Sequence, residues 1–286
     1  MRSTLAALAL TATLAALQPS AAHAQEPRSS VPSVVEIELR DGSKLYATVI
    51  SEDASRMVVR TVAGADVTLT RDQIRFIYKT AGAAVNGEFW TQDAVTSKLF
   101  LGPTGRSLRR GEAYMAIDSL FLPSFQVGVT DRFSIGVGLP LYGFVKTAYI
   151  TPKLQVFETD RFAVSTGVLH LFVPDFGLGG YGYVVATRGT ADNSVTFGGG
   201  ALYGRDDDGS GAIPMLTIGG EHRTGRRTKL VTESYIFKEG VIASVGTRFL
   251  GQTVSTELGV IVTVVDNNAP LPGFFINFVI HGRPRR

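Results

Sequence analysis

The sequence contains no cysteine among its 286 residues, and this absence excludes several kinds of protein. No disulfide framework can form, and neither thiolate catalysis nor a cysteine-based metal site is available. A chain without disulfides needs another source of stability. A large hydrogen-bonded sheet that closes on itself is one such source.

The sequence also lacks a strong excess of charge of either sign. The formal net charge is +3, and the Lys and Arg residues are dispersed along the chain. Nucleic-acid binding depends on basic side chains that gather on one face and neutralise phosphates. We therefore expect no nucleic-acid partner.

Long apolar runs are missing except at the N-terminus. There, Arg2 precedes an apolar run over residues 5–17, and Ala22-His23-Ala24 follows. This pattern is typical of a secretory signal peptide with an Ala-x-Ala cleavage site, so we expect a signal peptide over residues 1–24 and a mature chain from Gln25. A single membrane anchor is disfavoured, because the run is shorter than the about 20 residues of a spanning helix. No later uncharged stretch is long enough either, so any membrane insertion must use strands.

Residues 25–79 contain short strand patterns close together. Asp41-Gly42, with alternating residues on both sides, is a strong hairpin signal. Because closure removes exposed sheet edges, this density of strands favours a small SH3-like or Sm-like barrel. The run Val35-Glu36-Ile37-Glu38-Leu39-Arg40-Asp41-Gly42-Ser43 resembles the opening of Sm-like modules. We expect a periplasmic module with five strands at about 34–40, 43–50, 56–62, 66–70 and 73–78.

Neither a metal nor a cofactor is expected. The acidic residues of the module are placed at or beside turns, where Asp accepts local backbone hydrogen bonds. The histidines of the mature chain fall in separate expected strands without the close spacing of metal ligands. These side chains are Asp41, Asp53, Asp66 and Asp72, and His170, His222 and His281.

Residues 80–111 are rich in glycine and are expected to form a linker. Pro103-Thr104-Gly105-Arg106-Ser107-Leu108, followed by Gly111-Glu112-Ala113-Tyr114, resembles the sequence that leads into the first strand of a group of poorly characterised bacterial outer-membrane β-barrel proteins. The resemblance continues through residues 124–138. It implies a barrel fold, and it supplies neither a substrate nor catalytic residues.

Residues 112–286 alternate in the manner of a transmembrane barrel. Phe133, Ile135, Val137, Leu139 and Leu141 alternate with small or polar residues, and the same period of two recurs over residues 241–249 and 254–264. Turn signals divide the region into about twelve antiparallel strands, with ten as the next best number. A soluble β-sandwich or lipocalin-like barrel would also alternate. The abundant glycines on one face and the scarcity of charge favour the outer membrane, with bulky apolar side chains facing lipid.

Charged residues on the opposite face are candidates for the lumen. Such residues would form an interior network that either plugs the barrel or tunes a narrow pore, since a barrel of this size is nearly filled by side chains. The lumen-facing candidates are Lys153, Glu233, Arg248 and Glu257.

The leading hypothesis is an all-β, non-enzymatic outer-membrane β-barrel that acts as a narrow pore, binding protein or envelope scaffold. Its expected partners are outer-membrane lipid, the barrel-assembly machinery and a periplasmic protein that docks on residues 34–78. One alternative is a lipid- or peptide-acting barrel enzyme that uses His170 and His222, although no Gly-x-Ser-x-Gly elbow occurs. Another alternative is a soluble periplasmic β-rich binding protein.

Overall fold

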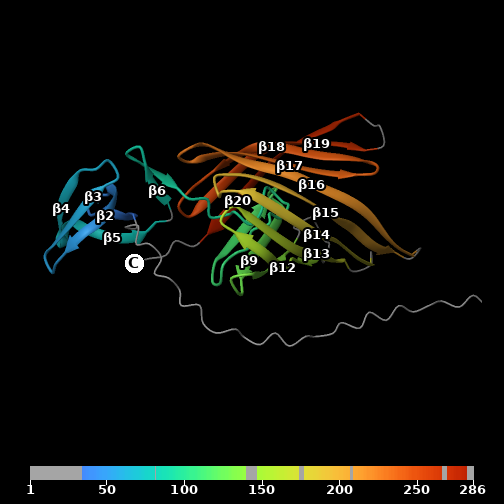
Figure 1. Cartoon of the computed structure of the whole chain (residues 1–286), viewed down its shortest axis with the longest axis horizontal. Coiled ribbons are helices and arrows are strands. Elements are labelled where there is room, and N and C mark those ends of the chain that lie inside the picture. The colour runs from blue at the N-terminus through green and yellow to red at the C-terminus, as the bar shows by residue number, and fades with distance from the viewer. Residues whose placement is uncertain are drawn as a thin grey trace, which may run out of the picture. The chain divides into compact units, whose positions relative to one another are not determined.

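The computed structural model describes residues 34–80, 82–139, 147–173, 177–206, 209–265 and 269–281, and these residues are almost entirely strands and loops (Figure 1). The exception is a single 3-10 turn, η1 (Arg71–Gln73). No helix in the described part of the chain is long and apolar enough to cross a membrane. The expected signal peptide lies outside the described residues and stays a prediction.

The first five strands form one antiparallel sheet in the order β4-β3-β2-β1-β5. The five strands expected from the sequence are confirmed. Its apolar core combines Val35 and Ile37 of β1 with Met57 and Val59 of β3, all buried. In the described pairing β4 and β5 are the outer strands, and the Sm-like name of the module stays a prediction. The strands are β1 (Val34–Leu39), β2 (Lys44–Glu52), β3 (Arg56–Thr61), β4 (Asp66–Thr70) and β5 (Ile74–Lys79).

The turns of this sheet use acidic side chains as local hydrogen-bond acceptors. Asp41 Oδ1 accepts the backbone N–H of Ser43 at 2.8 Å, beside Gly42 with a φ of +87°. Asp53 Oδ1 accepts the backbone N–H of Ser55 at 2.7 Å. Carboxylates engaged in this way fix the hairpins.

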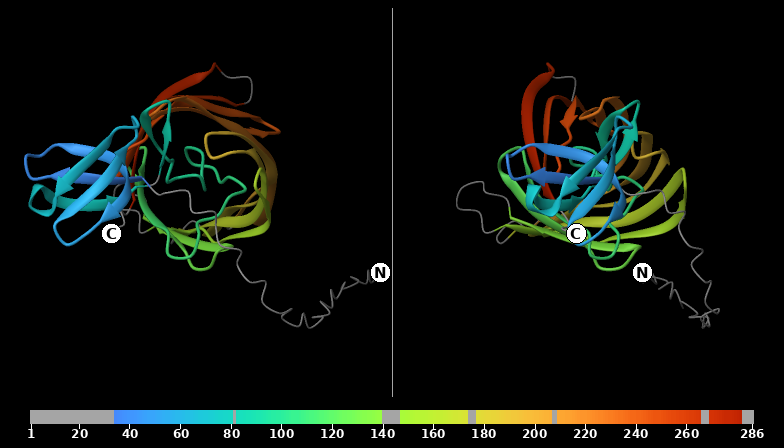
Figure 2. Two further views of the ribbon diagram at one scale, coloured as in Figure 1. Left: turned by 60° about the vertical axis from the view of Figure 1, so that its left-hand side comes forward. Right: turned by 90° about the vertical axis from the view of Figure 1, so that its left-hand side faces the viewer.

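The larger sheet is a closed antiparallel barrel of twelve strands, as the sequence predicted. The strands β11 and β12 form one wall strand that is interrupted at Thr151 and Pro152, and β20 pairs with β8 to complete the ring (Figure 2). This closing pair joins residues 278–281 of β20 to residues 114–117 of β8. The strands are β8 (Ala113–Asp118), β9 (Leu122–Gly128), β10 (Phe133–Gly138), β11 (Ala148–Ile150), β12 (Lys153–Thr159), β13 (Phe162–Val173), β14 (Gly177–Gly189), β15 (Asn193–Asp206), β16 (Gly209–Gly225), β17 (Thr228–Phe237), β18 (Gly240–Phe249), β19 (Val254–Val265) and β20 (Leu271–His281).

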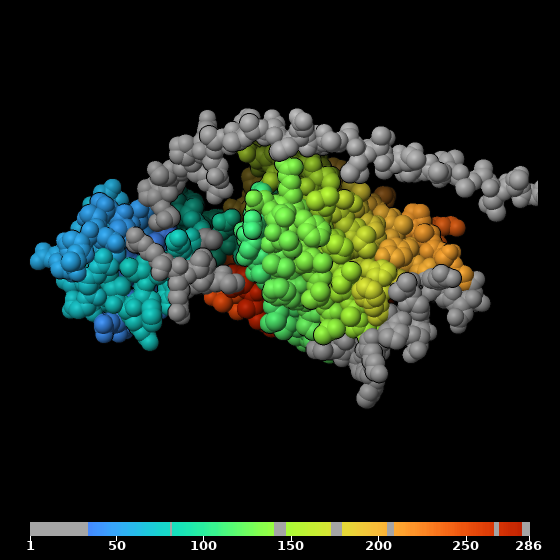
Figure 3. Space-filling model, turned by 90° about the horizontal axis from the view of Figure 1, so that it is seen from below, coloured from blue at the N-terminus to red at the C-terminus, as the bar shows by residue number. Residues whose placement is uncertain are grey.

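The two faces of the barrel differ as the alternation predicted. Val137 is 53% exposed, whereas its neighbours Gly136 and Gly138 are buried. In the same way Val260 is exposed on β19 and Glu257 is completely buried. Figure 3 shows the outer surface over the green and yellow strands, where neighbouring strands form a continuous wall. Leu141, which was also expected on the outer face, lies outside the described residues.

Glycines on the inner face make room for tyrosine rings. A Cβ atom at Gly138 would lie 2.0 Å from Cζ of Tyr149, and one at Gly200 would lie 2.8 Å from the ring of Tyr181. At Gly200 the Cβ atom would also lie 2.0 Å from the carbonyl oxygen of Gly182, so neither position accepts a larger residue in this arrangement. The inner glycines therefore create the space in which tyrosines gather.

Residues 80–111 are more structured than a simple linker. The strands β6 (Gly82–Val85) and β7 (Glu88–Thr91) pair through a turn at Asn86 and Gly87, both with positive φ. Residues 92–111 then run inside the ring of strands before β8 begins (Figure 2, left). We call residues 92–111 the plug segment.

Candidate functional site

The plug segment folds back on itself in a tight turn within the barrel. The backbone N–H of Leu99 donates to the carbonyl oxygen of Gly102 at 2.8 Å, and that of Thr104 donates to Ser97 at 3.1 Å. Pro103 carries no N–H, so it needs no acceptor at this point. The turn leaves a set of backbone donors and a set of backbone acceptors for the barrel wall.

Glu233 on β17 binds the donors of this turn. Its Oε2 accepts the backbone N–H groups of Phe100 at 2.7 Å and Leu101 at 3.1 Å, and its Oε1 accepts that of Gly102 at 2.8 Å. The Tyr235 hydroxyl donates to the same carboxylate. Successive backbone N–H groups that converge in this way form a binding nest for an anion. Here the anion is a side chain of the wall.

Arg248 on β18 binds the acceptors. Its Nη1 donates to the Val95 carbonyl oxygen at 3.0 Å and pairs with Asp93 Oδ2 at 2.7 Å. Its Nη2 donates to the carbonyl oxygens of Lys98 and Leu99. The planar guanidinium thus spans several plug residues at once, which a lysine at this position could not do.

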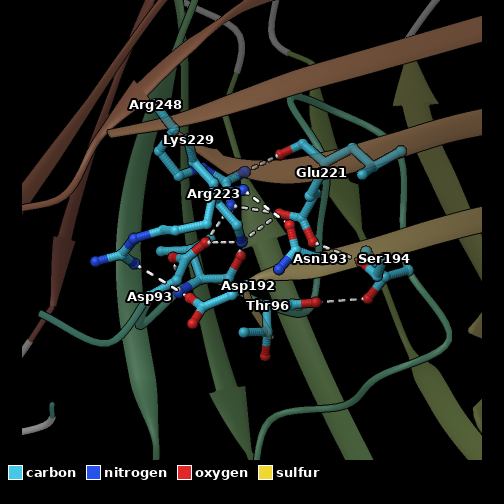
Figure 4. Close-up of polar contacts among 12 residues, drawn as sticks. Asp93, Thr96, Asp192, Asn193, Ser194, Glu221, Arg223, Lys229 and Arg248 are labelled. Atoms are coloured by element: carbon cyan, nitrogen blue, oxygen red, sulfur yellow. Dashed lines mark hydrogen bonds and ion pairs between the residues drawn. The ribbon is translucent and has the colours of Figure 1, made fainter. Parts of the chain in front are cut away.

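Further charged groups surround Arg248 (Figure 4). Its Nε lies 2.6 Å from Glu257 Oε1, and its Nη1 lies 3.0 Å from Glu221 Oε1. Lys229 Nζ lies 2.6 Å from Asp93 Oδ2 and 2.9 Å from Glu221 Oε1. All these side chains are completely buried. We call Asp93, Glu221, Lys229, Arg248 and Glu257 the ionic cluster.

The charges of the ionic cluster are nearly balanced within the barrel. Three carboxylates face two cations, and the plug residue Arg106 adds a third cation 3.8 Å from Glu221 Oε2. Asn277 Nδ2 donates to Glu257 at 2.7 Å, which uses a remaining oxygen. Buried ions are costly unless they are paired and hydrogen-bonded. Because Asp93 belongs to the plug segment, the balance depends on the plug being in place.

Arg223 on β16 holds the end of β7, directly before the plug segment. Its guanidinium carbon lies 5.4 Å from the ring centroid of Trp90 on β7, and its Nη2 donates to the Thr91 carbonyl oxygen at 2.8 Å. Trp90 is the only tryptophan in the chain. This contact combines a cation–π interaction with a charge-assisted hydrogen bond.

The other side of the plug segment is held by polar wall residues. Lys153 Nζ donates to the carbonyl oxygens of Ser97, at 2.8 Å, and Arg106. Gly105 donates its N–H to Thr187 Oγ1 at 2.7 Å and accepts from Ser165 Oγ at 2.8 Å. The plug is therefore attached around the ring and not at one strand alone.

A cavity of about 340 Å³ lies within the barrel beside the plug segment. Leu101, Gly102 and Pro103 of the plug contribute to its lining, as do Lys98 and Lys153. Lys98 is paired with Asp118, which also lines the cavity, at 2.6 Å. Five tyrosines also line the cavity: Tyr114, Tyr149, Tyr181, Tyr183 and Tyr235.

The four lumen-facing candidates are all buried and all lie around the plug segment. Lys153, Glu233 and Arg248 bind its backbone directly, and Glu257 binds it through Arg248. Sequence reasoning missed Glu221 and Lys229, which hold the plug with them. The alternation could have identified both residues, because they lie at the buried positions of alternating strands. It also missed Asp93, for which no periodicity offered a clue.

The histidines do not form a hydrolytic or metal-binding group with one another. His170 Nδ1 lies 2.7 Å from the Tyr203 hydroxyl, and its ring packs against Phe172. His222 lies on β16 and His281 at the end of β20. Within the described ranges, no group of three or more His, Asp or Glu side chains is placed to hold a metal ion.

Comparison with protein families finds no match, and comparison with curated proteins finds none either. Among solved structures, the NanC porin is similar with a TM-score of 0.43 and 8% identity, over 60% of this chain and 98% of that chain. OmpT lacking loop L8, an outer-membrane protein of Vibrio cholerae, gives a TM-score of 0.39 and 11% identity, over 87% and 96%. TM-scores of this size do not establish a shared fold.

Proposed function

We propose that this chain is a non-enzymatic outer-membrane β-barrel that is closed from within by its own plug segment and that binds a small ligand instead of forming an open pore. The ionic cluster carries this proposal. Arg248 and Lys229 of the wall meet Asp93 of the plug in a fully buried network. A segment attached in this way fills the lumen as part of the native structure.

Placement in a membrane is supported by the distribution of apolar side chains. Large hydrophobic residues such as Val184, Leu216 and Ile218 are at least half exposed on the outer face, while the charges lie inside. A soluble barrel would reverse this arrangement, because contiguous exposed apolar surface is unfavourable in water. The outward apolar band and polar interior are those of a barrel in lipid.

The topology supports a periplasmic origin for the plug segment. With twelve strands, β8 begins and β20 ends at the same end of the barrel, and the plug segment enters from there. Given the expected signal peptide, we assign this end to the periplasm and place residues 34–78 on that side. Outer-membrane lipid and the barrel-assembly machinery are the proposed partners of the barrel, and a periplasmic protein is the proposed partner of the five-stranded sheet.

The size of the barrel supports a ligand-binding role and not that of an open channel for diffusion. Eight strands leave an interior that side chains can fill, whereas barrels of about 16–18 strands leave an aqueous channel. Twelve strands lie between these limits, and here the plug segment and the inward tyrosines occupy the space. A cavity remains, but it is small and lined by rings.

Conductance across a planar lipid bilayer tests this function. We expect the wild-type barrel to stay closed and Gly105→Val to open it. A Cβ atom at Gly105 would lie 2.1 Å from the carbonyl oxygen of Ala163, so the plug could no longer lie against the wall. Gly211→Val is the matched control, because a Cβ atom there meets nothing within 4 Å.

Steady conductance of the wild-type protein would show an open pore and overturn the proposal. A Gly105→Val barrel that folds, as judged by heat-modifiability on gels, and still stays closed would show that the plug segment is not the seal. A protein that remains soluble without detergent would contradict the membrane assignment itself.

A further inference from the structure

The cavity beside the plug segment has the composition of a site for an amphipathic molecule. Apolar side chains, among them Leu122, Leu169 and Leu171, line it together with the five tyrosines. Its volume of about 340 Å³ is at the lower end of ligand pockets, which suits one chain better than a lipid with several chains. The polar part of the lining includes Gln126, the Lys98–Asp118 ion pair and Lys153.

Lys153 differs from the other buried cations of the lumen. Lys98 pairs with Asp118, Lys229 pairs with Asp93, and Arg248 pairs with three carboxylates. Lys153 is 6% exposed and donates only to backbone carbonyl oxygens, and no carboxylate of the described residues forms an ion pair with it. A buried lysine at the edge of a cavity is stabilised in its charged form when an anionic ligand supplies the counter-ion.

Two strands of the wall next to this cavity are short. A transmembrane strand needs about 9–11 residues, but β8 has 6 and β9 has 7. The strands β13 to β16, on another side of the ring, have 12 to 17 residues (Figure 1). Leu122, the first residue of β9, lines the cavity. The short strands of the wall therefore lie beside the cavity.

The neighbouring strand β20 extends beyond the end of β8. The last pair between β20 and β8 joins Phe278 to Ile117, and β20 continues beyond it to Leu271. In the described part of the chain, residues 271–276 pair with β19 on one side only. Unpaired backbone is unfavourable in the hydrocarbon layer unless it lines a protein cavity or is covered. Residues 119–121 at the tip of the β8–β9 hairpin line a groove together with residues 274–276 of this edge.

We infer that the cavity binds a single-chain amphipathic carboxylate, of the chemical class of a long-chain fatty acid, which enters laterally from the membrane above the β8–β9 hairpin and places its head group at Lys153. This inference rests on the proposed function, because it requires the barrel to lie in a membrane. The carboxylate supplies the missing counter-ion. The tyrosines and leucines enclose the chain.

Photochemical labelling of the full-length protein in liposomes tests this inference. The probe is a C16 fatty acid with a diazirine in its chain and a terminal alkyne, and mass spectrometry locates the labelled residues. The same chain with an alcohol head serves as the matched probe. We expect the carboxylate probe to label inner-face residues such as Tyr149 and Tyr181, about tenfold more than the alcohol, as for a lost charge-assisted hydrogen bond.

Two kinds of variant separate the head-group contact from the chain site. Lys153→Met should abolish the preference for the carboxylate, Lys153→Arg should retain it, and Lys238→Met on an exposed turn is the control. Leu169→Trp should block labelling of the cavity by filling it. Ile218→Trp on the outer face, which is 50% exposed in the native protein, should leave that labelling unchanged.

Labelling confined to outer-face residues would overturn the inference and leave the plugged barrel intact. Equal labelling by both probes, or unchanged labelling in a folded Leu169→Trp variant, would overturn it as well. If Lys153→Met fails to assemble, the Leu169→Trp comparison and the two probes still decide the outcome. Failure of the proposed function appears separately, as conductance of the wild-type barrel.

Discussion

The Arg248 guanidinium and the Asp93 carboxylate form an ion pair of 2.7 Å between Nη1 and Oδ2, although 155 positions separate them in the chain, and both side chains are fully buried. One partner belongs to the barrel wall and the other to the plug segment. The pair thus joins two parts of the fold that have no local sequence relationship. A substitution of Asp93 removes this ion pair without changing any residue of the barrel wall.

Asp93→Ala should release the plug segment without unfolding the barrel. Loss of one partner from a buried pair costs about 3–5 kcal/mol, because Arg248 and Lys229 lose a counter-charge. Limited trypsin digestion of the folded protein measures this, since Lys98 in the plug is 7% exposed. Cleavage there should be slow in the wild type and fast in the variant. Glu239→Ala, on an exposed turn, should digest like the wild type.

The barrel and its inner face could be predicted because strands carry a local code. A period of two assigns each residue to one face, and it separates Val137, which is exposed, from Glu257, which is buried. The same rule selected Lys153, Glu233 and Arg248 as candidates for the lumen. Their buried positions follow from register alone, since a slip by one residue would place these charges outside.

The plug segment could not be predicted because its contacts are long-range and use backbone atoms. Glu233 binds the N–H groups of Phe100 and Gly102, and any sequence at those two positions offers the same donors except proline. The glycines and Pro103, which allow the tight turn and the close approach to the wall, are also typical of linkers. Composition therefore favoured a connecting segment.

A cysteine pair tests the closure of the barrel between its first and last strands. Met115 on β8 lies directly opposite Ile280 on β20, and both side chains are exposed. Opposed residues of antiparallel strands have Cβ atoms about 4.5–5.5 Å apart, close to what a disulfide requires. Met115→Cys with Ile280→Cys should cross-link on mild oxidation, and the chain has no cysteine of its own to compete.

The matched control for this cross-link is Met115→Cys with Phe274→Cys, on the same outer face but beyond the paired register. This control should remain reduced under the same conditions. The observable is the mobility of the unheated protein on gels with and without reductant. Efficient cross-linking of the control pair, or none in the opposed pair, would contradict the register of β8 and β20.

An arginine on the outer face should destabilise the barrel strongly near the middle of a strand and only slightly at its end. We expect Val260→Arg on β19 to destabilise the barrel by about 2–4 kcal/mol, and Val254→Arg, on the same face at the end of the same strand, by about 0–1 kcal/mol. Urea titration of refolding into liposomes measures the difference. Equal effects at both positions would argue against a lipid-facing surface.

The five-stranded sheet should fold when it is produced as residues 25–80 alone. Its core is formed by its own strands, with Ile37, Ala47 and Met57 completely buried. Cooperative urea unfolding of the soluble fragment, followed by circular dichroism, is the expected result at neutral pH. A fragment that is disordered alone would mean that the sheet depends on the rest of the chain.

The stability of that fragment should fall in acid through its turn carboxylates. Hydrogen bonds from the backbone N–H groups of Ser55 and Arg56 lower the pKa of Asp53 below its ordinary value. A carboxyl whose pKa is lower in the folded state contributes its full stabilisation above the unfolded pKa, about 3.9, and loses it as the pH falls through the folded value. Urea midpoints should therefore be constant from pH 7 to about pH 5 and decline below about pH 4.

Asp53→Asn is the control, because it keeps an oxygen acceptor without a titrating charge. The decline of its urea midpoint in acid should be shallower than that of the wild type. Identical profiles would show that Asp53 does not contribute.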